Sequence, residues 1–192
     1  AGTNAPYKLG SPPDFGTLYS GRALEFDGVT DYVSIADDDS IDLGASDFTI
    51  SAWIYTGTSL SNQGIVGKKT DSNNRWYLMH DGVIKFYGKG DGDTFSEIVG
   101  TTTLLADTWY HIVFSCDRDV KCTVYLNGAD DTSGDGIGSD DITINLDNSA
   151  SLLLGATDED TELLDGKISN LQLWNKAWSL SDVQYAYTHP EK

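Results

Sequence analysis

Acidic residues crowd one short part of the segment LLLGATDEDTELLDGKISNLQLW, residues 152–174. They are Asp158, Glu159, Asp160, Glu162 and Asp165. Carboxylates placed this closely repel one another unless a metal ion or water offsets their charge. Such a cluster can also be retained because it takes part in a reaction. The segment is therefore the first place where the sequence suggests chemistry.

One interpretation of this segment is catalytic. Asp158, Asp160 and Glu162 are spaced two apart, so on an extended strand they would share a face and could act as nucleophile, helper and acid in glycoside hydrolysis. Glycosidases that use this device have apolar residues between the carboxylates, whereas Glu159 and Thr161 stand there in this chain. A glycan-active enzyme is therefore the third choice among the functions considered.

Other catalytic motifs are missing from the sequence. The three histidines, His80, His111 and His189, lie in neither a G-x-S-x-G elbow nor an H-E-x-x-H pair. Phosphate-binding G-x-x-x-x-G-K-[ST] loops and EF-hand loops are also missing. Triad hydrolysis, zinc hydrolysis and nucleotide chemistry are unsupported, and His111 is expected to be a strand residue near a sheet surface.

The two cysteines, Cys116 and Cys122, flank a short polar turn between two alternating apolar runs. If the runs form a hairpin, the cysteines face each other at a separation that a disulfide can bridge. The alternative is two free thiols, while a zinc site would need further Cys or His ligands at suitable spacing. A disulfide would indicate an oxidising compartment, and hence a secreted or surface-exposed protein.

The residues that could do chemistry need elements to position them, and the repeated pattern along the chain is that of β-strands. Apolar and polar residues alternate with period two, and turn residues separate the alternating runs at the spacing of an all-β sandwich. The predicted strands lie within residues 23–28, 31–37, 48–57, 75–82, 83–90, 109–116, 122–128 and 167–174. The turn signals are the Asp-Gly pairs at Asp27, Asp81 and Asp91 and the Asn-Gly pair at Asn127.

Helix is expected only near the end of the sequence, in SLSDVQYAYTH, residues 179–189. Ser179 can cap the amide of Asp182, and Asp182 favours the positive end of a helix. Residues 128–141 are too polar and Gly-rich to form a core and indicate a loop. The predicted fold is an all-β sandwich of antiparallel strands with one short C-terminal helix.

The composition limits the functions further. A chain of 192 residues fits one domain, and 12 Lys and Arg against 30 Asp and Glu give a net charge of −18. Such a charge repels nucleic acids and anionic membranes, and no run of eighteen apolar residues could insert into a bilayer. The first residue is Ala1 and the opening resembles a linker, so the chain is interpreted as a mature secreted protein or a domain of a larger protein.

The order of motifs is similar to that of laminin-G-like and pentraxin-like domains in the concanavalin A-like lectin/glucanase superfamily. The resemblance covers roughly residues 20–188. It rests on ALEFDGVTDYVSI, DFTISAWIY, GIVGKK, WYHIVFS, VYLNG, LLLGA and DGKISNLQLWNKAWSLSDV, in that order. The resemblance implies a jelly-roll sandwich of two antiparallel sheets over residues 20–192, with a linker or extra strand in residues 1–19. Members are mostly recognition modules for glycans or proteins, often with calcium, and fold alone does not settle function.

The resemblance implies two sets of calcium ligands. The first joins a polar loop to the acidic loop, as in pentraxins, with Asn73 in place of a pentraxin Asp and Thr157 in place of a Glu, so that a single ion is expected. Its ligands would be Asp71, Asn73, Asn74, Asp158, Glu159, Asp160 and Glu162. Oxygen-only ligands of this kind suit a hard cation such as calcium.

The second implied set is a structural ion site near the first core strand. Asp27 and Gly28, together with Asp165 at the start of the last strand, occupy the matching positions. The alternative is that Asp27 and Asp165 only form turns with the glycine that follows each of them.

The main hypothesis is a secreted, non-catalytic module that binds a surface ligand, most plausibly a glycan, with calcium as its ion. Trp76, Tyr77 and Tyr87 are candidate stacking platforms, although aromatic residues in a sandwich more often belong to the core. The alternative is a structural or adhesive domain of a viral fibre, a capsid decoration or a bacterial adhesin.

Overall fold

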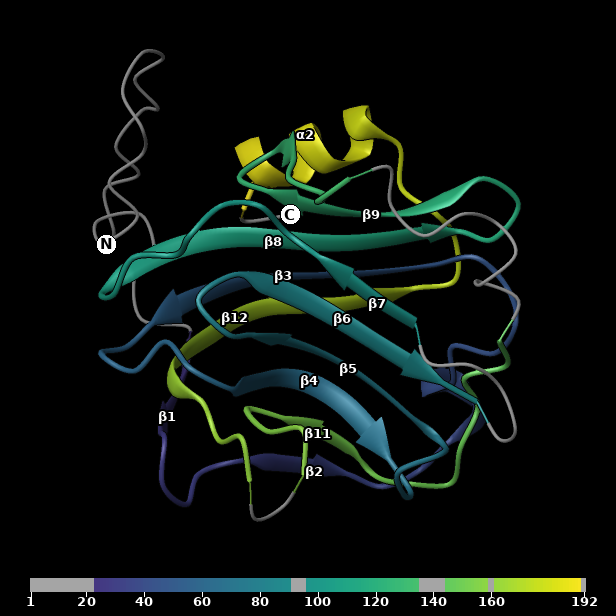
Figure 1. The fold of residues 1–192 in the computed structure, drawn as a ribbon, viewed down its shortest axis with the longest axis horizontal. Helices are drawn as coiled ribbons and strands as arrows, with labels where there is room; N and C mark the ends of the chain where they lie inside the picture. The colour runs from purple at the N-terminus through teal and green to yellow at the C-terminus, as the bar shows by residue number, and fades with distance from the viewer. Residues whose placement is uncertain (1–22, 91–95, 135–143, 159–160, 191–192) are drawn as a thin grey trace, which may run out of the picture.

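The computed structural model describes residues 23–90, 96–134, 144–158 and 161–190, and its fold is a β-sandwich (Figure 1). Sheet A has the strand order β1-β12-β3-β8-β9-β10, and sheet B has the order β2-β11-β4-β5-β6-β7. Both are six-stranded, and every strand pair is antiparallel. The predicted all-β jelly roll with one short C-terminal helix is confirmed.

The strands are mostly short, with long ones in the middle of sheet A. They are β1 (Leu24–Asp27), β2 (Val33–Ile35), β3 (Phe48–Thr56), β4 (Gln63–Lys69), β5 (Arg75–His80), β6 (Ile84–Lys89), β7 (Ser96–Val99), β8 (Thr108–Asp117), β9 (Lys121–Leu126), β10 (Ala129–Asp130), β11 (Leu152–Leu154) and β12 (Asp165–Trp174). A 3-10 helix, η1 (Asp39–Ile41), precedes β3, and one α-helix, α2 (Leu180–Thr188), follows β12.

Alternating burial explains why the patterned segments are strands. In β6 the buried residues Ile84 and Phe86 alternate with the partly exposed Lys85 and Tyr87. The buried side chains of both sheets meet between them and form the core, because each sheet must cover one apolar face. At the centre of this core, the rings of Phe86 and Phe114 stack with their centroids 3.9 Å apart.

The turns follow the predicted chemistry where the structure describes them. Asn127 and Gly128 have φ of 51° and 83° and connect β9 to β10, as a two-residue hairpin requires. Gly82, with φ of 73°, lies in the turn between β5 and β6. The Asp91 signal, the predicted N-terminal linker or extra strand, and much of the 128–141 loop lie outside the described residues.

The hairpin of β8 and β9 places Cys116 directly opposite Cys122, and the two form a disulfide. Their Cα atoms are 3.9 Å apart. The predicted pairing is confirmed.

The helix α2 covers the outer face of sheet A, beside β8 and β9 (Figure 1). Ser179 and Asp182 form the predicted capping box, in which each side chain binds the backbone N–H of the other residue. Val183 of α2 packs with Trp178 and Val113 of β8. No helix among the described residues is long and apolar enough to cross a membrane.

Candidate functional site

The turn of residues 70–74 and the acidic loop of residues 155–162 adjoin opposite ends of β4. The acidic loop packs beside the start of β4, where the N–H of Gly64 donates to the carbonyl of Glu162 at 2.7 Å. Lys69 ends β4 and pairs in register with Arg75 of β5, so the turn closes this hairpin. The acidic loop follows β11, which is the neighbour of β4 on its other side. The ammonium of Lys69 lies 2.5 Å from Oδ2 of Asp158. This ion pair links the acidic loop to the residue before the polar turn, but the strand register places the two segments of the first implied calcium set at different ends of β4.

Protein groups offset the charges of the described part of the acidic loop. Lys69 pairs with Asp158, and the hydroxyl of Thr157 donates to a carboxylate oxygen of Glu162. The chain turns sharply here, because Thr161 N–H donates to the carbonyl of Asp158 at 3.4 Å. Asp158 and Glu162 thus flank a tight turn rather than sharing one face of a strand. Glu159 and Asp160 lie outside the described residues.

The polar turn is organised by Asp71. Its Oδ1 accepts the backbone N–H groups of Asn73 at 2.6 Å and Asn74 at 3.0 Å. The Asn73 side-chain oxygen accepts a hydrogen bond from Lys89 at 2.9 Å. In contrast, the side-chain oxygen of Asn74 is buried and has no hydrogen-bond partner among the described residues. A buried oxygen of this kind can accept a donor or coordinate a cation.

The residues of the second implied calcium set, in contrast, are brought together. Asp27 and Asp165 are opposite each other in the pairing of β1 with β12. Gly28, with φ of 69°, lies so close that an added Cβ would be 2.9 Å from Cβ of Asp165.

Hydrogen bonds account for both carboxylates of this second set without a cation. Oδ1 of Asp27 accepts three backbone N–H groups, from residues 29–31, at 2.8 to 3.0 Å. These hydrogen bonds lower the pKa of Asp27 to about 2, and the bond from the N–H of Thr30 makes the largest contribution. Oδ2 of Asp165 accepts the N–H groups of Thr58 and Ser59 at 2.9 and 3.1 Å. Asp27 is therefore a turn-forming carboxylate, whereas Asp165 holds the distant segment of residues 58–59 against the start of β12.

No group of three or more His, Cys, Asp or Glu side chains is arranged to hold a metal ion in the part of the chain that the structure describes. A calcium ion would therefore need amide and backbone oxygens as well as carboxylates. The polar turn supplies such an amide in Asn74, whereas the Asp27–Asp165 pair is already filled by N–H donors. The first set fits a cation better than the second.

The candidate aromatic platforms separate onto two faces of sheet B. Trp76 is 0% exposed in the core, because alternate residues of β5 point to opposite faces, so it is a core residue and not a platform. Tyr77 and Tyr87 are cross-strand neighbours on the outer face, with ring centroids 5.0 Å apart. Tyr77 is only 9% exposed, whereas Tyr87 is partly exposed and offers the more accessible ring. The phenol of Tyr87 donates to Glu97 at 2.8 Å. Burial, together with this contact, raises the pKa of Tyr87.

Charged residues that the sequence interpretation did not select surround this tyrosine pair. Arg75 shares the outer face with Tyr77, and its guanidinium lies 5.8 Å from the centroid of that ring. Lys89 is the cross-strand partner of Arg75, and Glu97 that of Tyr87. The sequence could have indicated these charged residues, because side chains in a strand alternate between two faces and this alternation places Arg75 and Tyr77 on the same face.

A serine and a histidine meet on sheet A, but not as a catalytic pair. Oγ of Ser51 lies 3.2 Å from Nε2 of His111. His111 is 2% exposed beneath Tyr187 of α2, and its Nδ1 has no hydrogen-bond partner in the part of the chain that the structure describes. Burial lowers its pKa to about 4. A general base needs access to substrate and an orienting partner, and His111 has neither.

The comparison with protein families defines the class. Residues 27–184 match the Laminin_G_3 family, described as the concanavalin A-like lectin/glucanases superfamily, and the chain belongs to this family. No curated protein sequence matches the chain.

Solved structures share the fold at low sequence identity. The receptor binding domain of botulinum neurotoxin D is 13% identical, with a TM-score of 0.68, over 88% of this chain and 44% of that one. The native heptameric SAP-like pentraxin of Limulus polyphemus is 16% identical, with a TM-score of 0.58, over 86% and 81%. Domain 4 of AbnA, a GH43 extracellular arabinanase of Geobacillus stearothermophilus solved with arabinotriose, is 19% identical, with a TM-score of 0.58, over 79% and 71%. The chain spans less than half of the neurotoxin domain.

Proposed function

We propose that this chain is a non-catalytic recognition module that binds glycans at a cell or particle surface. The observation that carries the proposal is the tyrosine pair Tyr77 and Tyr87 on the outer face of sheet B, beside the polar turn of residues 70–74. Aromatic rings next to hydrogen-bonding groups suit sugars, which have apolar C–H faces and polar hydroxyl edges. The arabinanase domain, a structural relative, was solved with arabinotriose.

We further propose that the polar turn and the acidic loop hold one calcium ion. Asp71, Asn74 and Asp158 would be among its ligands, and the orphaned side-chain oxygen of Asn74 supports this assignment. Calcium accepts irregular sets of carboxylate and amide oxygens, and it would supply a positive centre for sugar hydroxyls or a bridge between the loops. Lys69 and Lys89, which contact Asp158 and Asn73, would have to move aside, and the acidic loop would have to shift along β4 toward the polar turn.

The disulfide between Cys116 and Cys122 supports an extracellular or surface location for this module, because disulfides persist in oxidising compartments. The competing function is a structural or adhesive domain of a viral fibre, a capsid decoration or a bacterial adhesin. That function requires no glycan ligand, so a binding assay distinguishes the two.

A glycan array probed in calcium and in chelator tests the proposed function. We expect binding to at least one glycan class, and a loss of that binding in Tyr87→Ala. An absence of glycan binding in either buffer would favour the structural or adhesive role, while turnover of a bound polysaccharide would favour an enzyme.

Thermal unfolding of metal-stripped protein tests the calcium proposal. An ion bound only by the folded state, at a hundred times its Kd, stabilises by about 2.7 kcal/mol. We expect Asp71→Asn to weaken this effect, while the matched control Asp117→Asn, whose carboxylate likewise accepts the N–H two residues ahead, keeps it. Identical melting curves in calcium and in chelator, at equal ionic strength, would remove calcium from the proposal.

A further inference from the structure

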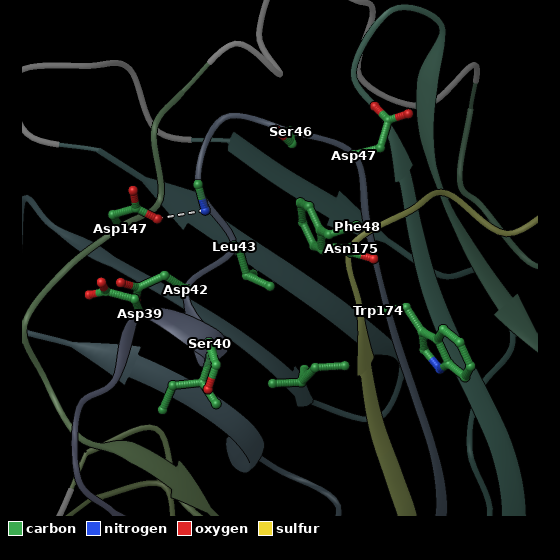
Figure 2. A pocket seen from close by; sticks show the side chains of 13 residues that line it. Asp39, Ser40, Asp42, Leu43, Ser46, Asp47, Phe48, Asp147, Trp174 and Asn175 are labelled. Carbon is green, nitrogen blue, oxygen red and sulfur yellow. Dashed lines mark hydrogen bonds between the residues drawn. The ribbon is translucent and has the colours of Figure 1, made fainter.

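A groove of about 240 Å³ lies between α2 and the end of β12, on the outer face of sheet A. Its strand wall follows from the register, in which Leu173 is opposite the core residue Ile50. The neighbouring side chains of Gln172 and Trp174 therefore point to the outer face. Figure 2 accordingly shows the indole of Trp174 pointing away from Asp42. We name this site the α2 groove.

One face of α2 forms the other wall of the α2 groove. The residues on this face are spaced three and four apart, as neighbours on a helix surface are, and they are Asp182, Tyr185, Ala186 and His189. His189 is the C-cap of α2, and its ring stacks on that of Tyr185 with centroids 4.1 Å apart. Val183 lies on the adjacent face of the helix and packs on sheet A. The helix is thus anchored through one face while another faces the groove.

The groove gathers exposed aromatic surface. Among the described residues, the three most exposed Trp, Tyr or Phe side chains are Tyr32 at 38%, Trp174 at 41% and Tyr185 at 53%. Two of these three, Trp174 and Tyr185, line the α2 groove, one from each wall. A folded protein buries most rings of this size, so two in one concave site indicate a surface that a ligand covers.

Trp174 is held in place before any ligand binds. Its indole N–H donates to the side-chain oxygen of Gln172 at 2.9 Å, and the amide of Gln172 donates to the side-chain oxygen of Asn170 at 2.9 Å. The Trp174 ring contacts that of the buried Trp178, with centroids 5.6 Å apart and planes inclined at 57°. A side chain fixed in this way loses little conformational entropy when a ligand stacks on it.

Hydrogen-bonding groups of both kinds surround the two rings. The ammonium of Lys176 lies 5.7 Å from the centroid of the Trp174 ring and supplies donors. Nδ1 of His189 is 2.9 Å from the carbonyl oxygen of Tyr185. Because a carbonyl only accepts, Nδ1 carries the hydrogen, and Nε2 is the acceptor of the neutral imidazole. The carboxylate of Asp182 balances the charge of Lys176, so the lining favours neither anions nor cations.

Because two exposed rings converge with hydrogen-bond donors and acceptors, we propose that the α2 groove binds one ring of a neutral glycan without calcium. The C–H face of the sugar stacks on Trp174, and its hydroxyls bond to Lys176 and His189. The volume is below the roughly 300 Å³ at which sites for drug-sized ligands begin, so a single ring fits better than an extended chain. This inference rests on the proposed glycan recognition and gives it a second site, on the face of the sandwich opposite Tyr77 and Tyr87.

An array of neutral glycans that includes maltotriose, cellotriose and arabinotriose, probed in chelator, tests this site, and titration calorimetry measures the Kd of the glycans that bind. We expect Trp174→Ala to weaken binding at least about tenfold, and Trp174→Phe, which keeps an aromatic face, to retain most of it. The matched control is Trp109→Ala, which removes an indole from the same outer face but outside the groove and should leave the Kd unchanged.

A second pair of variants keeps the test decisive if Trp174→Ala fails to fold. Tyr185→Ala removes the ring of the helix wall at an exposed position, where alanine favours helix, and should weaken binding of the same glycans by about fivefold or more. Gln184→Ala changes the preceding residue of α2, which does not line the groove, and should bind as the wild type does.

The outcomes separate this inference from the proposed function. Neutral glycans that bind in chelator, lose binding in Trp174→Ala and keep it in Tyr87→Ala support the α2 groove. Glycan binding that requires calcium, or that is insensitive to both Trp174→Ala and Tyr185→Ala, overturns the groove but leaves glycan recognition intact. Binding of no glycan in either buffer overturns both. Tighter binding of sialyllactose, choline or a proline-rich peptide at the groove would overturn the assigned ligand class.

Discussion

Lys68 places a positive charge on the core side of sheet B. Its side chain is 0% exposed, and its ammonium contacts the carboxylates of Asp37 at 2.6 Å and Asp42 at 2.5 Å. Burial alone would lower the pKa of Lys68, but the two carboxylates more than offset this and hold the pKa above its ordinary value. The same ion pair fixes Asp42 at the C-terminal end of η1.

Replacing Lys68 with Met should lower the free energy of unfolding by about 3 kcal/mol, because two carboxylates lose the partner that neutralises them. Urea unfolding near neutral pH measures this. Because the folded pKa is raised, the stabilisation is complete below pH 10.5 and declines as the pH rises above it. The control is Lys167→Met, whose partner Glu25 is 74% exposed and whose loss should cost less than about 1 kcal/mol. Equal effects would contradict the assignment.

At the scale of elements, the helix α2 and the β8–β9 hairpin each stabilise a part of sheet A that strand pairing alone leaves exposed. The helix covers His111, whose imidazole meets the rings of Trp53 and Tyr187 at 5.0 and 5.9 Å. The disulfide closes the hairpin at the end away from the Asn-Gly turn.

Acid should weaken the contact of α2 with sheet A. The folded pKa of His111 is lowered from 6.5 to about 4, so the unfolded chain binds more protons in this range and stability falls as the pH drops through it. At a pH below the folded pKa, a histidine with this shift lowers the free energy of unfolding by about 3 kcal/mol. His111→Phe should therefore lose less stability than the wild type between these pH values, as measured by urea unfolding. Parallel pH curves would show that His111 does not contribute.

Reducing the disulfide should lower the free energy of unfolding by about 2 to 3 kcal/mol, because the closed loop is short. The sandwich core should keep the fold intact. Unfolding curves with and without reductant measure the change, and the double variant Cys116→Ala with Cys122→Ala should show no response to reductant. Loss of all folded signal on reduction would contradict a local role.

Sequence patterns predicted these elements unevenly. Strands with one exposed face, such as β6, showed the period of two. Strands β4 and β11 were not predicted, because their sequences, QGIVGKK and LLL, do not alternate between apolar and polar residues. The disulfide could be predicted because its hairpin is local.

The candidate sites were predicted less well for a related reason. Lys68 lies 31 and 26 positions from its two partners, and Lys69 lies 89 from Asp158. Such pairings depend on the order of strands in the sheets, which no local pattern contains.

At the scale of the whole molecule, the net charge of −18 sets a background repulsion that all local contacts must overcome. The described lysines that pair with carboxylates reduce it only locally, as at Asp158. Ions from solution should therefore matter for stability.

Raising the ionic strength from about 0.01 M to about 0.15 M shortens the Debye length from about 30 Å to about 8 Å. Sodium chloride should therefore raise the melting temperature over this range, and the rise should level off at higher concentration. Calorimetry at several concentrations measures it, with sucrose at matched osmolality as the uncharged control. A melting temperature that falls with salt would mean that attractive pairs outweigh the repulsion.

The strand order of sheet A has a consequence for synthesis on the ribosome. β12, the last strand in the chain, lies between β1 and β3, which are made early. Until residues 165–174 emerge, one edge of β3 has no partner in sheet A and β1 cannot join that sheet. A nascent or prematurely ended chain therefore presents an open strand edge to its neighbours, which makes chaperone binding or aggregation a property of the unfinished polypeptide.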